Sequence, residues 1–180
     1  MKTFKQYVLS ESPWLLDYYH KDHFDNGEAN YMKSEIRGDV HVSSTKDHDI
    51  YMGINPHNME ASYTAVHRRT GLPHLRVQGQ MTKQGLNISN LVSHEKNTLK
   101  AHDFYHHLLT NHVVPGLVSD NQQSLGGKKV WHKLSQMPRV KMGATGGDHK
   151  YNDWNFHSHY TDEENDWDRA QKRLTAKLDD

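Results

Sequence analysis

Three polar side chains that follow expected strands are the candidates for acid–base chemistry. His94 and Glu95 come directly after an expected strand at 86–93, and Asp120 comes directly after another at 113–119. A histidine or carboxylate can take a proton from a nucleophile, and a second carboxylate can orient it, when the fold brings them together. We therefore expect Glu95 or His94 as a general base and Asp120 as an orienting group. Ordinary loop polarity is the alternative.

A glycine doublet followed by two lysines is the second chemical candidate, because glycine-rich turns can bind phosphate. A Walker phosphate loop needs glycine five residues before its Gly-Lys-Ser/Thr, but Gln122 stands there and Lys129 follows Lys128. The motif GxGxxG does not occur either. The doublet is therefore expected to let a helix pack closely, with Ser124 as its cap. The apolar residues expected to face the core are Val130, Trp131 and Leu134.

Histidine is abundant, at 16 residues, and two groups of histidines could bind a metal. His102 and His106 have the i, i+4 spacing of helical zinc ligands, but the motif HExxH is absent. The second group is His149, His157 and His159, with Asp148 and Asp153 nearby. A partly exposed helix flank and an exposed polar edge are the favoured interpretations, so no metal is expected. Because imidazole titrates near neutrality, the net charge should change sharply between about pH 7 and 5.5.

The elements that must position these residues follow from hydrophobic periodicity. Alternating apolar and polar residues predict strands at 39–43, 48–54, 61–68, 72–80 and 86–93. Apolar residues at helical spacing then predict helices at 98–112 and 124–137, separated by a strand at 113–119 and followed by one at 139–142. This order predicts an α/β (α+β) fold with a mixed, largely antiparallel sheet and flanking helices.

The two ends of the chain give helical signals as well. Ser12 and Pro13 are expected to be the N-cap and the first residue of a helix, and the polar stretch 20–38 is expected to be a loop. After the glycine-rich stretch 143–147 comes an aromatic segment, and then an expected final helix. Its capping box is Thr161 and Glu164, and its second half contains the basic residues Arg169, Lys172, Arg173 and Lys177.

Length and composition bound the possible functions. The 180 residues suit one domain with a decorated end, and 22 basic residues balance 22 acidic ones, so no overall positive field favours nucleic acid or an anionic membrane. The chain has no cysteine, which excludes disulfides and thiolate nucleophiles. No apolar run approaches the length of a membrane span. A macromolecular partner must therefore be recognised locally, and a protein is favoured over nucleic acid.

The second helical segment resembles the last motif of the GNAT acyl-coenzyme A N-acyltransferases, and the resemblance extends over about residues 48–142. In that family a helix carries Asn, two residues, Ala or Gly, three residues, Tyr, and then a Lys. The residues at these places are Ser124, Gly127, Trp131 and Lys133. The resemblance implies a GNAT-like strand order and acetyl-coenzyme A or another acyl-coenzyme A as cofactor. Trp131 departs from the family tyrosine, and an indole N–H cannot act as a general acid at neutral pH.

The same resemblance implies a pyrophosphate site between the fourth strand and the next helix. The family has a glycine-rich turn there, whereas HEKNTLKA at 94–101 has no glycine. The residues that could still hold the coenzyme are Lys96, Asn97, Thr98 and Lys100, together with Ser124. A solvated helix cap is the alternative.

The first eleven residues, MKTFKQYVLSE, resemble the capsid-targeting peptide of internal head proteins of large tailed bacteriophages. In that family a protease cuts after Leu or Ile, any residue and Glu, which matches Leu9, Ser10 and Glu11 before Ser12. The resemblance implies that residues 12–180 reside in the virion interior and later reach the bacterial host cytoplasm. An ordinary amphipathic helix is the alternative. The Glu-x-Glu signature of packaged ADP-ribosyltransferases does not occur, since Glu163 and Glu164 are adjacent.

Together these observations predict four segments: a removable targeting helix at 1–11, a helix and polar linker at 12–38, a GNAT-like core at 39–142, and an aromatic tail with a terminal helix at 143–180. The first expected function is a phage-delivered acyltransferase-like effector that acylates a host macromolecule. The alternative is a non-catalytic protein that binds and inhibits a host defence factor through aromatic residues such as Trp154 and Phe156. A third hypothesis is a small metal-dependent hydrolase that uses His102 and His106.

Overall fold

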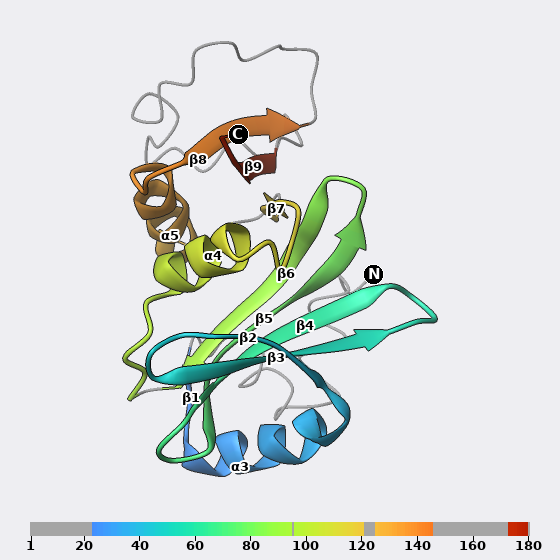
Figure 1. Ribbon diagram of the computed structural model, residues 1–180, viewed down its shortest axis with the longest axis vertical. Helices are drawn as coiled ribbons and strands as arrows, with labels where there is room; N and C mark the ends of the chain where they lie inside the picture. Colours follow the sequence, from blue (N-terminus) through green and yellow to red (C-terminus); the bar gives the residue numbers. More distant parts are fainter. Residues whose placement is uncertain (1–22, 95, 121–124, 146–172, 180) are drawn as a thin grey trace, which may run out of the picture.

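The computed structural model of the chain describes residues 23–94, 96–120, 125–145 and 173–179. These residues form one nine-stranded sheet, three α-helices and a short 3-10 helix (Figure 1). The strands are β1 (His23–Phe24), β2 (Val40–Ser44), β3 (His48–Asn55), β4 (Glu60–His67), β5 (Leu72–Thr82), β6 (Gly85–His94), β7 (Leu117–Val118), β8 (Val140–Thr145) and β9 (Arg173–Leu178). The helices are α3 (Asn26–Glu35), η1 (Ile36–Gly38), α4 (Ala101–Thr110) and α5 (Leu125–Ser135).

Strands β2 to β6 form an antiparallel meander in chain order. Because apolar and polar residues alternate along these strands, the apolar side chains lie on one face of the sheet. Ile50, Ala65 and Leu75 are successive partners across β3, β4 and β5, and all three are fully buried. The expected meander is therefore confirmed, with strand ends that differ from the expected ones by at most two residues.

The chain then leaves the meander and returns in parallel. Strand β7 pairs with β6 in parallel after the crossover through α4, and β9 lies between β7 and β8, antiparallel to both. The order is β2-β3-β4-β5-β6-β7-β9-β8, while β1 pairs in parallel with the end of β6. The expected mixed, largely antiparallel sheet with flanking helices is thus confirmed.

Helices cover both faces of the sheet. The larger core joins the sheet to α4 and α5 through residues such as Phe104, Leu108 and Trp131. A smaller core joins it to α3 through Ala29 and Met32. Leu91 belongs to the first core and Val92 to the second, and neighbouring strand residues point to opposite faces. Helix α3 therefore lies on the face opposite α4.

Helix α3 was not expected, because its segment falls in the stretch 20–38 that was interpreted as a polar loop. Asp25 caps the helix by accepting the N–H groups of Gly27 and Glu28, and the Glu28 carboxylate accepts the N–H of Asp25 in return. This capping box satisfies N–H groups that a helix start leaves unpaired. The loop prediction is wrong over 26–35, because the capping box and the burial of Ala29 and Met32 stabilise a helix in an otherwise polar segment.

Strand β9 corrects the prediction of a terminal helix over its last residues. Arg173 and Lys177 lie in a strand in which Leu174 and Ala176 are buried and Lys177 is exposed. Burial at every second residue is the pattern of a strand with one face in the core. The strand expected at 113–119 is also shorter than predicted, since only Leu117 and Val118 are paired.

Several expected features lie outside the described residues. They are the targeting helix at 1–11, the Pro13 helix start, Glu95, Ser124, the aromatic segment with Trp154 and Phe156, the tail histidines, and the capping box of Thr161 and Glu164. Within the described part of the chain, no helix is both long enough and apolar enough to cross a membrane.

Candidate functional site

Four histidines lie at one end of four neighbouring strands. His48 begins β3, His67 ends β4, His74 lies near the start of β5, and His94 ends β6. Because these strands are antiparallel, the starts and ends named here fall at the same end of the sheet. Ring centroids are 5.3 Å apart from His48 to His67, 4.6 Å from His67 to His74 and 5.6 Å from His74 to His94. We call these four residues the histidine row.

Burial and contact keep the middle of the histidine row uncharged. Nε2 of His48 lies 3.2 Å from Nδ1 of His74, so one of these nitrogens must lack a proton and accept the hydrogen bond. Only 3% of His48 and 7% of His74 are exposed. Burial, followed by the charges of His48, His67 and His94, lowers the pKa of His74 to about 4. Burial also lowers the pKa of His48.

His94 connects the histidine row to the turn that leads into α4. The N–H of Lys96 donates to Nδ1 of His94 at 3.0 Å, and the N–H of Asn97 donates to the His94 carbonyl at 2.9 Å. A ring nitrogen that accepts an N–H bond carries no proton, so Nδ1 of His94 is the acceptor in this contact. The Nδ1 lone pair, which a general base would use, is therefore engaged within the turn.

The turn at 96–100 satisfies its own backbone. Besides the bonds to His94, the Leu99 N–H donates to Oδ1 of Asn97 at 2.8 Å, and Nδ2 of Asn97 donates to the Leu99 carbonyl at 2.6 Å. Thr98 and the N-cap residue Lys100 are exposed, and Lys100 makes no side-chain cap bond. A phosphate would have to compete with internal acceptors for the amides of Lys96, Asn97 and Leu99.

Trp131 lies in the core and not at a surface site. Only 3% of it is exposed, and its ring lies 5.9 Å from that of buried Tyr105 on α4. The expectation that Trp131 and Leu134 face the core is confirmed, and Val130 is half-buried against them. Burial raises the pKa of Tyr105, so its phenol stays protonated as well. Neither ring is placed to transfer a proton to a substrate.

Asp120 lies near the opposite end of β6 from His94. Strand β7 pairs with the first residues of β6, Leu86 with Leu117 and Asn87 with Val118. His94 is seven residues beyond Asn87, about 23 Å along an extended strand. The structure therefore does not bring Asp120 together with His94.

Asp120 lines an open cleft of about 310 Å³. Its walls are mostly polar, and they consist of Asn58, Glu60, Gly79, Gln80, Asn87, Ile88, Ser89, Asp120 and Arg173. Two carboxylates, three amide side chains and one guanidinium supply both hydrogen-bond donors and acceptors. The neighbouring Ser119 is fully buried. Its Oγ accepts the Leu174 N–H at 2.8 Å and donates to the Asp120 carbonyl, so this hydroxyl helps to hold β9 in the sheet.

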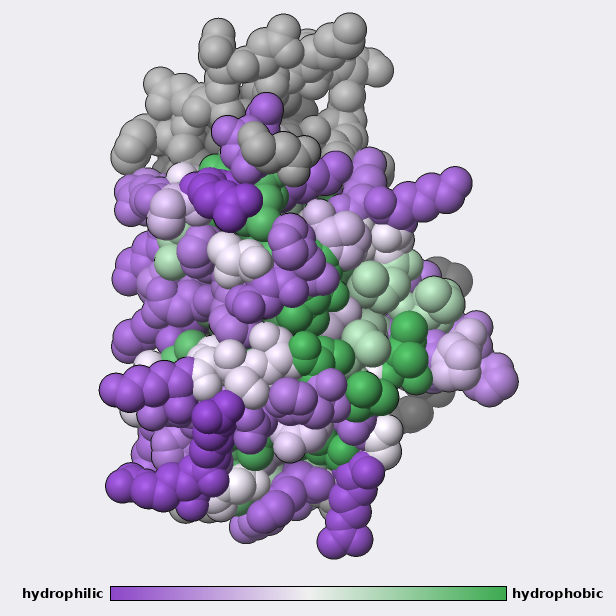
Figure 2. Space-filling model, in the orientation of Figure 1, coloured by the Kyte–Doolittle hydropathy of each residue, from purple (hydrophilic) through white to green (hydrophobic). Residues whose placement is uncertain are grey.

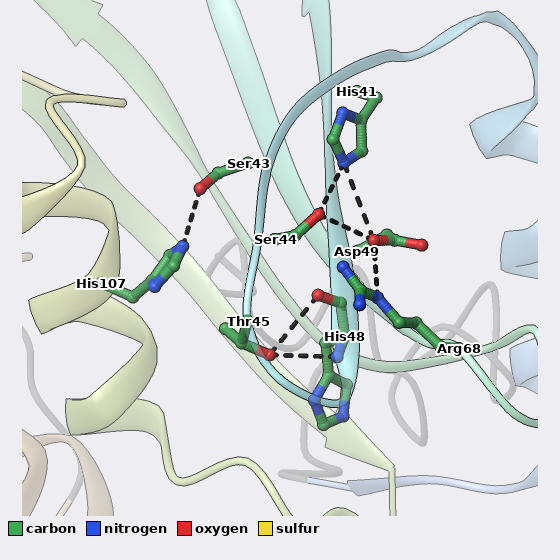
Figure 3. A network of polar contacts seen from close by, with 8 residues as sticks. All are labelled: His41, Ser43, Ser44, Thr45, His48, Asp49, Arg68 and His107. Carbon is green, nitrogen blue, oxygen red and sulfur yellow. Dashed lines mark hydrogen bonds and ion pairs between the residues drawn. The ribbon is translucent and has the colours of Figure 1, made fainter.

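The histidines of α4 have separate partners. Nε2 of His106 donates to the Pro138 carbonyl at 3.0 Å, whereas His102 lies 3.7 Å from Asp103. His107 is hydrogen-bonded to Ser43 of β2 at 2.8 Å (Figure 3). Within the described residues, no group of three or more histidines or carboxylates is arranged to hold a metal ion.

A second polar network fastens the edge strand β2. Asp49 accepts the hydroxyl of Ser44 at 2.8 Å and Nε of Arg68 at 2.9 Å, and His41 lies nearby (Figure 3). The Ser44 hydrogen bond, and then Arg68, lower the pKa of Asp49. This carboxylate is therefore occupied with joining β2, β3 and the end of β4.

No family model, curated protein or solved structure matches this chain. Its residues therefore take their roles from their own geometry. The histidine row was not predicted from the sequence. His48 and His67 are equally distant from the observed turn at 56–59, whereas the expected turn at 55–58 would pair His48 with Ala65.

Proposed function

We propose that this chain is a non-catalytic binding protein that captures a protein of a bacterial host. The observation that carries the proposal is the satisfied turn at 96–100, which leaves the amides of Lys96, Asn97 and Leu99 engaged within the protein. The buried Trp131 and the separation of Asp120 from His94 support it further, because these two described residues do not form an acid–base pair.

An exposed apolar surface supports a role in binding. The exposed apolar residues Val40, Ile54 and Met59 lie on β2, at the end of β3 and in the turn before β4. Val40 is the partner of half-buried Met52, two residues before Ile54. Figure 2 shows apolar surface gathered beside polar surface on this view of the molecule. Contiguous exposed apolar surface on a soluble domain commonly marks an interaction site.

The proposed setting is a phage infection. It is supported by the resemblance of residues 1–11 to capsid-targeting peptides, with Leu9, Ser10 and Glu11 before the expected cut. The protein would occupy the capsid interior and act in the host cytoplasm, where inhibition of a defence factor is the expected result of capture.

Capture from a bacterial lysate tests the proposal with a matched pair of variants. Ile54→Asp places a charge in the apolar surface, and Tyr31→Asp places the same charge on exposed α3. The full chain and Tyr31→Asp should retain the same host protein, identified by mass spectrometry, whereas Ile54→Asp should lose it. Equal retention by both variants, or no retained protein, would contradict the proposal.

The second candidate function is an acyltransferase-like effector. It is favoured by the order β6, α4, β7, α5 and β8, and by the parallel pairing of β6 with β7. Acyl-coenzyme A would then lie against Lys96, Asn97, Thr98 and Lys100. Calorimetry of the full chain with acetyl-coenzyme A and desulfo-coenzyme A should give no binding heat. Micromolar binding that is lost in a Lys96→Ala, Lys100→Ala double variant would make this the leading function.

A further inference from the structure

The histidine row is a cluster that the proposed function does not use. It contains three nearly buried imidazoles, His48, His74 and His94, on three different strands of the sheet. Two of its hydrogen bonds need an unprotonated ring nitrogen: His48 with His74, and the Lys96 N–H with His94. An imidazolium has donors on both nitrogens and can accept neither bond.

We propose that the histidine row is a pH-sensitive lock, which holds the ends of β3 to β6 and the turn at 96–100 while its imidazoles are neutral and releases them when it is protonated. Protonation of His74 would break the bond to His48 if Nδ1 is its acceptor, and protonation of His94 would break the bond to Lys96. It would also place like charges on rings whose centroids lie 4.6–5.6 Å apart.

The charges around the row fix the direction of this response. The groups that act on His74 are His48, His67 and His94, and all three oppose its protonation. Around His48, His67 opposes a positive charge while Asp47 and Asp49 favour one. Asp49 is already paired with Arg68, and its bond to Ser44 keeps it facing β2.

Two further elements reach this end of the sheet. Strand β1 does so through backbone pairing of His23 with Ser93. Lys33 of α3 extends to the turn at Gly71, between His67 and His74 in the chain.

Ring geometry favours this role over metal binding. The planes of His67 and His74 are within 7° of parallel and stacked. Nitrogen lone pairs lie in the ring plane, so those of two stacked rings run side by side and do not converge on one ion. Stacked neutral imidazoles, in contrast, pack as flat apolar surfaces with their hydrogen bonds at the edges.

Local hydrogen exchange of the full chain at pH 7.5, 6.0 and 5.0 tests the proposal. Protection factors, corrected for intrinsic exchange, should fall by up to about tenfold per pH unit below 6.5 in peptides that cover 48–50, 72–76 and 94–100. Peptides from the opposite end of the same strands, such as 79–88, should stay protected over the first unit. Equal loss at both ends, or no loss at either, would overturn the lock.

A variant pair and an NMR titration complete the test. His74→Gln should reduce the pH response, whereas His57→Gln, the same change at an exposed turn histidine, should leave it unchanged. A response of undiminished size in folded His74→Gln overturns the proposal. Should that variant not fold, imidazole NMR of the unmodified chain decides: two or more rings must stay neutral at pH 6 and become charged only as this end opens. A rise in melting temperature on addition of zinc that is lost in His74→Gln would identify a metal site instead.

Discussion

Nε2 of His48 and Nδ1 of His74 lie 3.2 Å apart, although β4 separates the strands that carry them. Strands two apart in a sheet are about 9.5 Å from each other. The two side chains must therefore lean together past the end of β4, where His67 stacks on His74. The contact ties three strands at one point, and its hydrogen bond requires a neutral ring.

Stability should consequently decrease as the pH falls below 6.5. The pKa values of His48 and His74 are lowered by folding, so the unfolded chain binds protons first. Their contribution is complete above pH 6.5 and is lost as the pH falls toward about 4, by about 1.4 kcal/mol per pH unit for each histidine that stays neutral. Urea unfolding at pH 7.5, 6.0 and 5.0 measures this slope. His74→Gln should remove the contribution of His74 to this slope, and His57→Gln should leave the slope unchanged. A free energy of unfolding that does not change with pH in the unmodified chain would contradict the lowered pKa values of His48 and His74.

Gly85 should not tolerate a side chain. Its φ is +131°, and a Cβ there would lie 1.9 Å from the carbonyl oxygen of Gly116. The Leu86 N–H also donates to that oxygen, which fixes its position. Gly85→Ala should therefore cost more than about 3 kcal/mol or prevent folding.

Gly38→Ala is the matched control, because no atom lies within 4 Å of the added Cβ. It should change the free energy of unfolding by less than about 0.5 kcal/mol. Comparable melting temperatures for the two variants would show that β6 and the residues before β7 are less closely packed than described.

Leu174 should be essential to the sheet even though it lies near the end of the sequence. It is 1% exposed within the larger core, and its N–H is bound by Ser119. Leu174→Ala should cost about 2–5 kcal/mol in urea unfolding. Lys177→Ala, on the exposed side of the same strand, should cost less than about 0.5 kcal/mol. Equal effects would argue that residues 173–178 are not a strand in the core.

Removal of the capping box should lower the stability of α3 by a measurable amount. Asp25→Ala removes the acceptor for two N–H groups and should cost about 1 kcal/mol. Glu28→Gln retains an oxygen that can accept the Asp25 N–H, so it should cost less. Hydrogen exchange in peptides that cover 26–35 would detect both changes, and the absence of any difference would count against the box.

The sequence was sufficient to predict the strands of the meander, but not the strands β7 and β9 that extend the sheet beyond it. Alternation located β2 to β6 because each of these strands is several residues long and has one face in the core. Strand β7 has only two paired residues, too few for a periodic signal. Residues 173–178 have alternating burial, but the acidic and basic groups around them favoured a helix. Tertiary pairing with β7 and β8 decides their conformation.

The candidate site was harder to predict for the same physical reason. His94 and Asp120 both follow strands, and local pattern predicts that each ends a strand. Their separation depends on the register of β7 along β6, which only the tertiary structure sets. The pairing of His48 with His67 depends on a turn, which fixes register over the whole hairpin. The turn lies at 56–59 and not at the expected 55–58, and this shift of one residue changes the partner of His48 from Ala65 to His67.

The position of β9 between β7 and β8 has a consequence for how the molecule folds. Within the described residues, β8 pairs only with β9, so it cannot join the sheet until β9 has entered. The pairing of Leu117 with Ala176 closes a long loop, whereas the hairpins of the meander close short ones. Long loop closure is slow, and contacts distant in sequence form late. We expect an ordered meander to appear first in stopped-flow refolding. A slower phase should follow, in which β9 enters the sheet and β8 pairs with it.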